Sequence, residues 1–228
     1  MRTYRVSALA SAALRMWRGW TVLVPVVIVN AVVQALLVWP PFTYDATWYV
    51  IVSAVISAIV FLIAYGLLAV VALRVADGRV GWSVAIAGLR ANLARYTVWA
   101  VLLSVVVVIG LALYTIPGLI VLAITPFLLL AALDDRPNPL AVNFHTLGRR
   151  FWRWLVTVVI TGIGILLGSV IAGFTEFFWR GGIGALLVWL VGGLLFAWVT
   201  VAWGLIYRSA WAEPGVPEPA HDPDLAPA

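Results

Sequence analysis

The chain has 228 residues, 64% of them hydrophobic and only 10% charged, whereas soluble globular domains are about 45 to 50% apolar and about 25% charged. This composition excludes an ordinary soluble domain and indicates an integral membrane protein. The net charge is +5, and because the arginines fall in short groups between apolar runs, it favours membrane orientation over nucleic-acid binding.

Six apolar runs along the chain are predicted to cross a membrane as helices. A helix that crosses about 30 Å of hydrocarbon needs roughly 20 residues. Tryptophan, tyrosine or arginine stands at the ends of most of these runs, as expected at the boundary between lipid and water. In chain order, the predicted spans cover residues 20–39, 48–73, 96–115, 119–133, 154–174 and 182–207.

The segment before the first span is predicted to be a surface helix. Residues 6–14 follow Arg2 and Arg5, as the apolar region of a secretory signal peptide would. Arg15 and Arg18 come directly after them, however, which suits a helix on the membrane surface better than a cleaved leader. We therefore expect the chain to keep this segment.

The third and fourth spans come from one uncharged run, residues 96–133. A single helix of that length would extend roughly 57 Å, nearly twice the hydrocarbon thickness, so the chain must fold back. We place the reversal at the sequence Thr-Ile-Pro-Gly, residues 115–118, because proline cannot continue a helix and glycine accepts turn conformations. Pro126 predicts a kink in the fourth span; the alternative is a broken helix whose free carbonyl groups bind a ligand.

An amphipathic helix is predicted at residues 138–154, directly before the fifth span. Four apolar residues recur there at steps of four, three and four, which places them on one side of a helix. Asn138 and Pro139 supply the start, as N-cap residue and first helical residue. Arginines and tryptophans follow where lipid headgroups would lie. The apolar residues are Leu140, Phe144, Leu147 and Phe151.

Two further segments share this pattern and indicate three repeated units. A shift of 58 positions aligns residues 140–154 with residues 82–96, and a weaker match lies near the N-terminus. Inner loops that enter a span could converge on the same pattern, but we favour true repetition. The units are residues 1–76, 77–135 and 136–211, which form one membrane domain over residues 1–211, and a disordered, proline-rich, acidic tail follows at residues 212–228.

The placement of the arginines predicts the side of the membrane that each loop faces. Basic residues near spans are enriched on the cytoplasmic side. With the N-terminus inside, only Arg180 of the 14 arginines falls outside. The sequence therefore predicts an all-α membrane protein with six transmembrane helices arranged as three hairpins. Each hairpin is preceded by an amphipathic helix on the cytoplasmic face, and both termini are cytoplasmic.

The second half of the chain, residues 77–207, resembles the YciC-like family of bacterial inner-membrane proteins and the related membrane domain of some glycerophosphodiester phosphodiesterases. The resemblance implies six spans in a bacterial inner membrane and no catalytic residues. The chain departs from the family at residues 143–146, Asn-Phe-His-Thr, where the family has an acidic residue and a basic pair before a serine. The features that carry the resemblance are Ile116-Pro117-Gly118, Pro126, Asn138-Pro139-Leu140-Ala141 and Arg150-Phe151-Trp152-Arg153.

Few polar residues lie within the predicted spans, and none is ionisable at membrane depth, which counts against a proton- or ion-coupled carrier. Asn30 and Gln34 are four residues apart and share one face of the first span. They could line a substrate path, but we favour hydrogen bonds between helices. Small residues four apart are predicted to serve helix packing rather than a glycine-lined pore. These small residues are Gly164, Gly168 and Ala172 in the fifth span and Gly193 and Ala197 in the sixth.

No catalytic or metal site is recognisable in the sequence. The chain has no cysteine, and His145 is the only histidine outside the tail, so no metal site is predicted. Asp134 and Asp135 are adjacent and would point apart, so we expect them to end a helix. We therefore predict that the protein is not an enzyme and requires no cofactor.

The remaining electrostatic feature is the set of arginines on the predicted inner face. Such residues attract anionic lipid headgroups by on the order of 1 kcal/mol each, although generic anchoring of the protein is the simpler explanation. The candidate headgroup-binding residues are Arg15, Arg18, Arg90, Arg95, Arg149, Arg150 and Arg153.

These observations together predict a non-catalytic structural or accessory role, with membrane lipids and other membrane proteins as partners and no nucleic acid. The alternative is a transport component, either a permease subunit or a carrier for a lipid-like or weakly polar solute.

Overall fold

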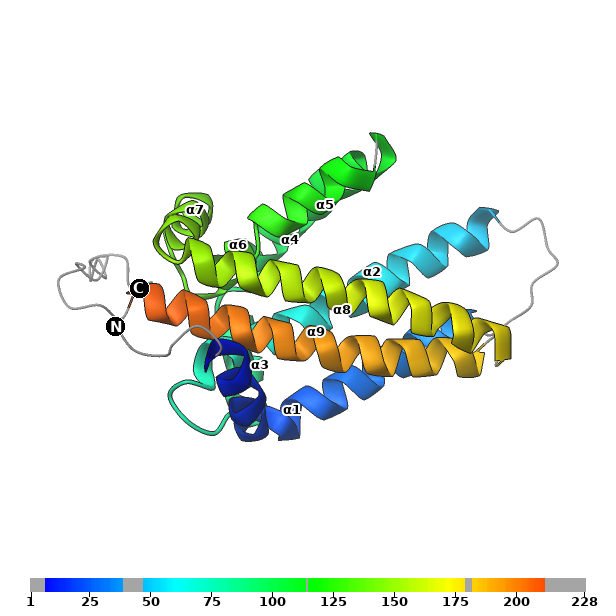
Figure 1. Ribbon diagram of the computed structural model, residues 1–228, viewed down its shortest axis with the longest axis horizontal. Helices are drawn as coiled ribbons and strands as arrows, with labels where there is room; N and C mark the ends of the chain where they lie inside the picture. Colours follow the sequence, from blue (N-terminus) through cyan, green and yellow to red (C-terminus); the bar gives the residue numbers. More distant parts are fainter. Residues whose placement is uncertain (1–6, 39–46, 114, 179–181, 212–228) are drawn as a thin grey trace.

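The structure is a computed structural model that describes residues 7–38, 47–113, 115–178 and 182–211 (Figure 1). Throughout these ranges the regular elements are α-helices, and no strand occurs among them, which confirms the predicted all-α class. The helices are α1 (Ser7–Val38), α2 (Thr47–Arg74), α3 (Trp82–Ala91), α4 (Leu93–Leu113), α5 (Thr115–Ile124), α6 (Leu128–Leu133), α7 (Pro139–Arg149), α8 (Phe151–Phe178) and α9 (Gly182–Trp211).

Five of the described helices are long and apolar enough to cross a membrane, which makes this a membrane protein by length and composition. The candidate spans are Ala10–Val38, Trp48–Arg74, Leu93–Leu113, Phe151–Val170 and Gly182–Trp211. The predicted spans at residues 20–39, 48–73, 96–115, 154–174 and 182–207 each correspond to one of them. Some predictions lie outside the described residues: the positions of Arg2, Arg5 and Arg180, and the disorder of the tail.

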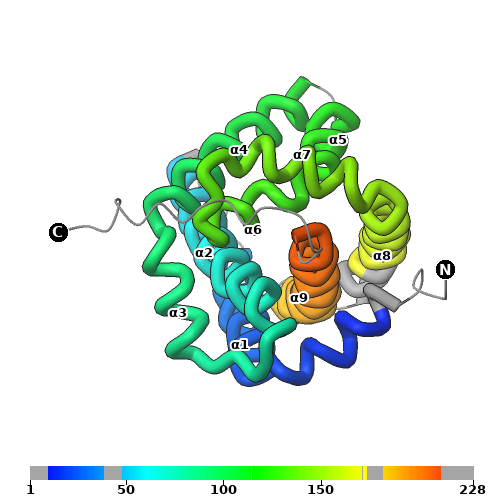
Figure 2. The backbone as a smooth tube through the Cα atoms, turned by 90° about the vertical axis from the view of Figure 1, so that its left-hand side faces the viewer, coloured from blue at the N-terminus to red at the C-terminus, as the bar shows by residue number. Residues whose placement is uncertain are grey.

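Helix α9 is the centre of the bundle. It packs chiefly against α1, and also against α2 and α8 (Figure 2). Close approach depends on glycine: a Cβ atom at Gly204 would lie 2.5 Å from the carbonyl oxygen of Ala72 in α2, and one at Gly193 would lie 2.8 Å from the side chain of Val27 in α1. The core of the protein therefore joins its first two long helices to its last.

Helices α4 and α5 lie antiparallel, so the chain reverses between them, as the excess length of residues 96–133 requires. The contact is tight because both helices present glycine: a Cβ atom at Gly110 would lie 2.8 Å from the backbone nitrogen of Gly118. The reversal lies slightly earlier than predicted, because residues 115–118 already form the first turn of α5.

The predicted fourth span, residues 119–133, is not one kinked helix but two short helices, α5 and α6, separated by residues 125–127. This corrects the expectation of a simple kink at Pro126. Proline has no N–H group and its ring blocks the preceding turn, so the helical hydrogen bonds stop there. The side chain of Asn143 in α7 replaces them: its Nδ2 donates to the carbonyl oxygen of Ile124 over 2.8 Å, and its Oδ1 accepts from the backbone N–H of Phe127 over 3.0 Å.

The two short amphipathic helices α3 and α7 end in the same way. Asn92 follows α3 with φ −120° and ψ 21°, and Arg150 follows α7 with φ −121° and ψ 30°. Each is a single non-helical residue before a long helix, and the two positions differ by the 58 residues found in the sequence. No such break interrupts α1, whose first turns cross the end of the bundle before the helix runs along it (Figures 1 and 2).

Helix α7 begins as predicted, because the side chain of Asn138 accepts a hydrogen bond from the backbone N–H of Ala141, with Pro139 in the first turn. Its exposed side is apolar: Leu140 and Phe144 are open to the surroundings, whereas Asn143 is fully buried. The helix thus buries Asn143 and Thr146 and exposes Leu140 and Phe144, as expected where part of the surroundings is lipid, whereas His145 and Arg149 stay exposed.

Candidate functional site

The arginines in the described ranges gather at one end of the bundle. This is the end where α1 begins, where α2 and α9 finish, and where α3, α6 and α7 lie; we call it the basic end (Figures 1 and 2). The described arginines are Arg15, Arg18, Arg74, Arg79, Arg90, Arg95, Arg136, Arg149, Arg150, Arg153 and Arg208.

Three of the predicted headgroup ligands instead close the C-terminus of α9. Arg149 donates to the carbonyl oxygen of Ala210 over 3.1 Å, and Arg150 donates to that of Ser209 over 2.6 Å. Arg153 lies 3.4 Å from the hydroxyl of the same serine. The last carbonyl groups of a helix lack partners within it and carry partial negative charge, so these arginines stabilise the helix end.

Arg95 also has a protein partner, since its guanidinium lies 2.6 Å from the carboxylate of Asp135 and 3.2 Å from the carbonyl oxygen of Arg136. Asp135 ends α6 in the left-handed conformation, with φ 55°, as expected of a helix-ending residue. Four of the seven candidate headgroup ligands therefore already bind acceptors within the protein.

A compact polar cluster fixes the segment after α6. The carboxylate of Asp134 accepts hydrogen bonds from Arg136 and from the hydroxyl of Tyr207, each over 3.0 Å. The guanidinium of Arg136 also lies 4.9 Å from the ring centre of Trp211. Burial alone would lower the pKa of Arg136, but its interactions with Tyr207 and Asp134 outweigh this effect and raise it. This arginine therefore stays charged as a structural link between α6 and α9.

The other predicted headgroup ligands are Arg15, Arg18 and Arg90. Their guanidinium groups have no hydrogen-bond or ion-pair partner in the part of the chain that the structure describes, and the same holds for Arg74 and Arg79. Exposure alone does not explain this difference, because Arg149 is exposed although it is bonded, and Arg15 is half-buried. These five cations are available to an external anion.

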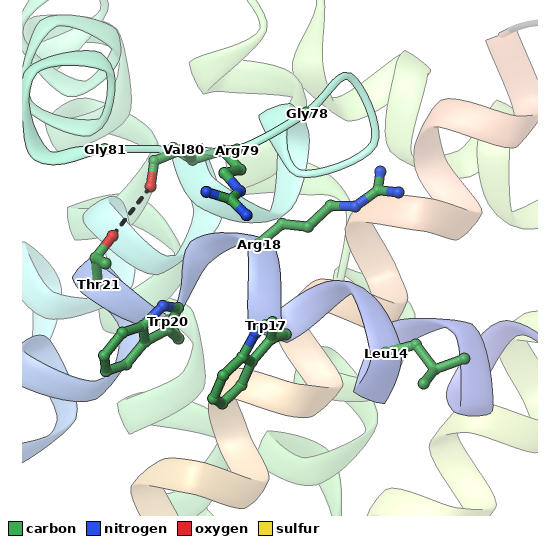
Figure 3. Close-up of a pocket in the computed structure, with 9 residues that line it drawn as sticks. All are labelled: Leu14, Trp17, Arg18, Trp20, Thr21, Gly78, Arg79, Val80 and Gly81. Carbon is green, nitrogen blue, oxygen red and sulfur yellow. Dashed lines mark hydrogen bonds between the residues drawn. The ribbon is translucent and has the colours of Figure 1, made fainter.

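Arg18 and Arg79, two of the available arginines, line a pocket of about 730 Å³ beside residues 14–21 of α1 (Figure 3). Two hydrogen bonds hold the loop between α2 and α3 against α1 there. The backbone N–H of Val80 donates to the carbonyl oxygen of Arg18 over 3.1 Å, and the hydroxyl of Thr21 donates to the carbonyl oxygen of Val80 over 3.5 Å. Arg18 rises from α1 and Arg79 descends from the loop, on the same side of the helix.

An aromatic shelf lies on the opposite side of this stretch of α1. The rings of Trp17 and Trp20 stack with centroids 5.4 Å apart and planes 9° apart, and they are 73% and 48% exposed. Figure 3 shows both rings pointing away from the loop that carries Arg79. Both arginines and both tryptophans line the pocket, but the two cations and the exposed rings lie on opposite sides of α1. An amphiphile with an anionic head suits this arrangement only if its apolar part passes around the helix.

Sequence reasoning did not single out Arg79 as a ligand. Its contribution depends on the loop lying against Arg18, which is 61 positions earlier in the chain. The sequence feature that could have indicated Arg79 is its position between Gly78 and Gly81, where an added Cβ atom would meet nothing within 4 Å.

The two polar residues predicted in the first span have different surroundings. Gln34 exchanges hydrogen bonds with Ser57 in α2: the serine hydroxyl donates to its Oε1 over 2.7 Å, and its Nε2 lies 3.3 Å from the serine carbonyl oxygen. Asn30 is only 7% exposed, and its buried Oδ1 has no hydrogen-bond donor within the described ranges. Gln34 thus joins two helices, and Asn30 does not.

The small residues predicted to serve helix packing differ between the fifth and sixth predicted spans. Gly193 packs against α1 and Ala197 is fully buried. A Cβ atom at Gly164 or Gly168 would meet nothing within 4 Å, and Ala172 is half-buried. Within one chain, therefore, the sixth predicted span uses its small residues for close packing, whereas the two glycines of the fifth make no such contact.

The described ranges contain no group of three histidine or acidic residues placed to hold a metal ion. His145 instead lies against the ring of Trp211, with centroids 5.3 Å apart. No family model, curated protein or solved structure matches the chain, and the YciC-like resemblance stays a prediction that depends on the residues quoted for it.

Proposed function

We propose that the protein is a non-catalytic, multi-pass protein of the bacterial inner membrane that binds anionic phospholipid at its basic end and supports the organisation of lipids or other membrane proteins there. The pocket formed by Arg18 and Arg79 carries this proposal. It places two cations that have no partner in the described ranges on one side of α1 and a tryptophan shelf on the other, at the end of the bundle where headgroups would lie.

The proposal includes the finer topology of six spans in three hairpins with both termini cytoplasmic. In support, the described arginines lie at one end, as cytoplasmic basic residues would. Helices α5 and α6 have 10 and 6 residues, which together extend about 24 Å at 1.5 Å per residue. As a broken helix in the place of the predicted fourth span, they would add the crossing that brings the five long helices to six spans. The common ends of α3 and α7 support repeated units.

A phospholipid fits the pocket better than a free anion does. The phosphate group would lie between the two guanidinium groups, which pair well with planar or tetrahedral oxyanions. The acyl chains would pass around α1 to reach Trp17 and Trp20 on its other side, which are otherwise exposed. A free phosphate ion would leave this aromatic surface uncovered.

The experiment is native mass spectrometry of the purified protein with phosphatidylglycerol and, separately, with phosphatidylcholine. We expect Arg18→Gln combined with Arg79→Gln to abolish preferential binding of phosphatidylglycerol. The matched control combines Arg74→Gln with Arg90→Gln, which removes the same charge from two arginines that lie outside the pocket and have no partner in the described ranges, and it should retain that binding. Equal loss in both variants would indicate generic anchoring and refute a defined site.

A second candidate function is that of a transport component, and a cavity beside Asn30 favours it. A continuous path is harder to reconcile with the structure, because Gln34 bonds to Ser57 on one side of Asn30 and Val22 and Val201 fill the core on the other. Co-purification of one stoichiometric ATPase with the native protein would favour a permease subunit over a free-standing accessory protein.

A further inference from the structure

A cavity of about 280 Å³ lies between α1, α2 and α9, among the candidate membrane spans. Asn30, which lines it, is eight residues before the end of α1, or about 12 Å at 1.5 Å per residue, so the cavity lies well inside about 30 Å of hydrocarbon. The phospholipid pocket lies at the basic end instead. The cavity is therefore a separate site, and its solvent is lipid rather than water.

The lining of the cavity has one amide among apolar groups. Apart from Asn30 it consists of aliphatic residues, glycine and aromatic residues, of which Tyr65 carries a hydroxyl and Trp189 an indole N–H. No charged side chain of the described ranges lines it. Small-molecule sites have this composition, with a largely apolar wall and a few polar groups that fix the orientation of the ligand. The absence of charge in the lining selects for a neutral ligand.

The oxygen of the Asn30 amide has no partner in the described part of the chain. This atom, Oδ1, has less than 1 Å² of accessible surface and accepts no hydrogen bond there, although a buried polar atom without a partner destabilises the protein by about 1 to 3 kcal/mol. Hydrocarbon chains of the membrane cannot satisfy it. A ligand that carries a hydroxyl group can do so once the amide turns toward the cavity, because a hydroxyl both donates and accepts and so matches either face of an amide.

The size of the cavity limits what enters it. At about 30 Å³ for each water-sized unit, 280 Å³ holds roughly nine such units, which corresponds to a hydroxyl group and a short hydrocarbon segment or ring. Gly192 contributes to this space, because a Cβ atom placed there would meet nothing within 4 Å. The rest of a longer chain would leave through the open side of the cavity into the lipid.

We propose that this cavity binds a neutral, hydroxyl-bearing lipophile, such as a long-chain alcohol or a diacylglycerol, with the hydroxyl group bonded to Asn30 and the adjoining hydrocarbon against the aromatic residues of the lining. The site goes beyond the proposed binding of anionic phospholipid, and it uses none of the arginines.

The test compares two probes that differ by one hydrogen-bond donor. Purified protein is unfolded by heat with 1-dodecanol or with its methyl ether, which keeps an oxygen but cannot donate, at equal mole fractions in the micelle. We expect dodecanol to raise the unfolding midpoint by several degrees and the ether to do so by less than half as much. Equal shifts would overturn the proposal, because the orphaned Oδ1 requires a donor.

Three variants locate the effect. Asn30→Leu removes the amide, and Gly192→Leu fills the cavity; each should abolish the difference between the two probes. Gly164→Leu is the matched control, since a Cβ atom there also meets nothing but lies on α8 outside the cavity, and it should keep the wild-type difference. A Gly192→Leu protein that still distinguishes the probes would refute binding in this cavity. Retained phosphatidylglycerol binding would show that the variants are folded.

Discussion

Asn143 bridges the break in the fourth predicted span, and its replacement tests whether a side chain can substitute for helical hydrogen bonds at Pro126. The residue is fully buried and holds both sides of the break, accepting from Phe127 and donating to Ile124. We take Asn143→Leu as the perturbation, because leucine has the same number and branching of side-chain heavy atoms and leaves no cavity while it removes both hydrogen bonds.

The expected loss follows from the two backbone groups that remain. Each buried polar group left without a partner destabilises a protein by about 1 to 3 kcal/mol, so two such groups predict a loss of about 2 to 6 kcal/mol. An ordinary hydrogen bond between helices in a membrane contributes on average only about 0.6 kcal/mol, and two would give about 1.2 kcal/mol. The larger value is expected because the broken helix offers the Phe127 N–H and the Ile124 carbonyl no alternative within α5 or α6.

The assay is equilibrium unfolding in mixed micelles with an increasing fraction of denaturing detergent, followed by helical ellipticity. Asn138→Ala serves as the control, because it removes one exposed capping bond from the same helix and should lose only about 1 kcal/mol. A loss for Asn143→Leu no larger than that of the control would refute the reasoning, since the break would then hold without its bridge.

Two further variants test the packing and the ion pairs. Gly204→Ala should lose about 1 to 3 kcal/mol, because the new Cβ atom would lie 2.5 Å from the carbonyl oxygen of Ala72 and force α9 from α2, whereas Gly192→Ala should be neutral or slightly stabilising in the same unfolding assay. Arg95→Gln should lose less than about 1 kcal/mol, because the side chains of Arg95 and Asp135 are 37% and 60% exposed and water screens the pair. A Gly204→Ala variant as stable as the wild type, or a loss of more than about 2 kcal/mol in the free energy of unfolding for Arg95→Gln, would contradict these two predictions.

The positions of the long helices were readable because hydrophobic length and interfacial residues act locally. The second predicted span, residues 48–73, differs from the candidate span Trp48–Arg74 by one residue. The start of α7 was readable for the same reason, since Asn138 and Pro139 stand next to the groups they cap. Such signals need no knowledge of the rest of the fold.

The division of the fourth span could not be read, because it depends on a distant residue. Proline at position 126 allows a kink or a break, and a break becomes tolerable only when Asn143 supplies the missing bonds. The residue lies in the segment Asn-Phe-His-Thr, which is not covered by the predicted YciC-like resemblance. Asn143 has a structural role there.

The sequence could not show which arginines bond within the protein, because those bonds also depend on distant residues. Arg149 and Arg150 find their acceptors at Ala210 and Ser209, about 60 positions later in the chain, so nothing near them in sequence reveals the pairing. Arg18 has the same charge, but its guanidinium group has no partner among the residues that the structure describes. Charge identifies the end of the bundle, whereas the fold decides which arginines remain available to lipid.

Because α9 packs against α1, the core of the bundle cannot form until the last helix has been synthesised. During synthesis at about 5 to 20 residues per second, roughly 7 to 30 s separate completion of α1 at Val38 from the appearance of α9 at Gly182. Throughout that interval the face of α1 that α9 will cover, including Val22 and Val26, has only lipid or another protein to contact. The bundle therefore reaches its native core only with its last helix, and a chain that stops before Gly182 exposes that face for as long as it persists in the membrane.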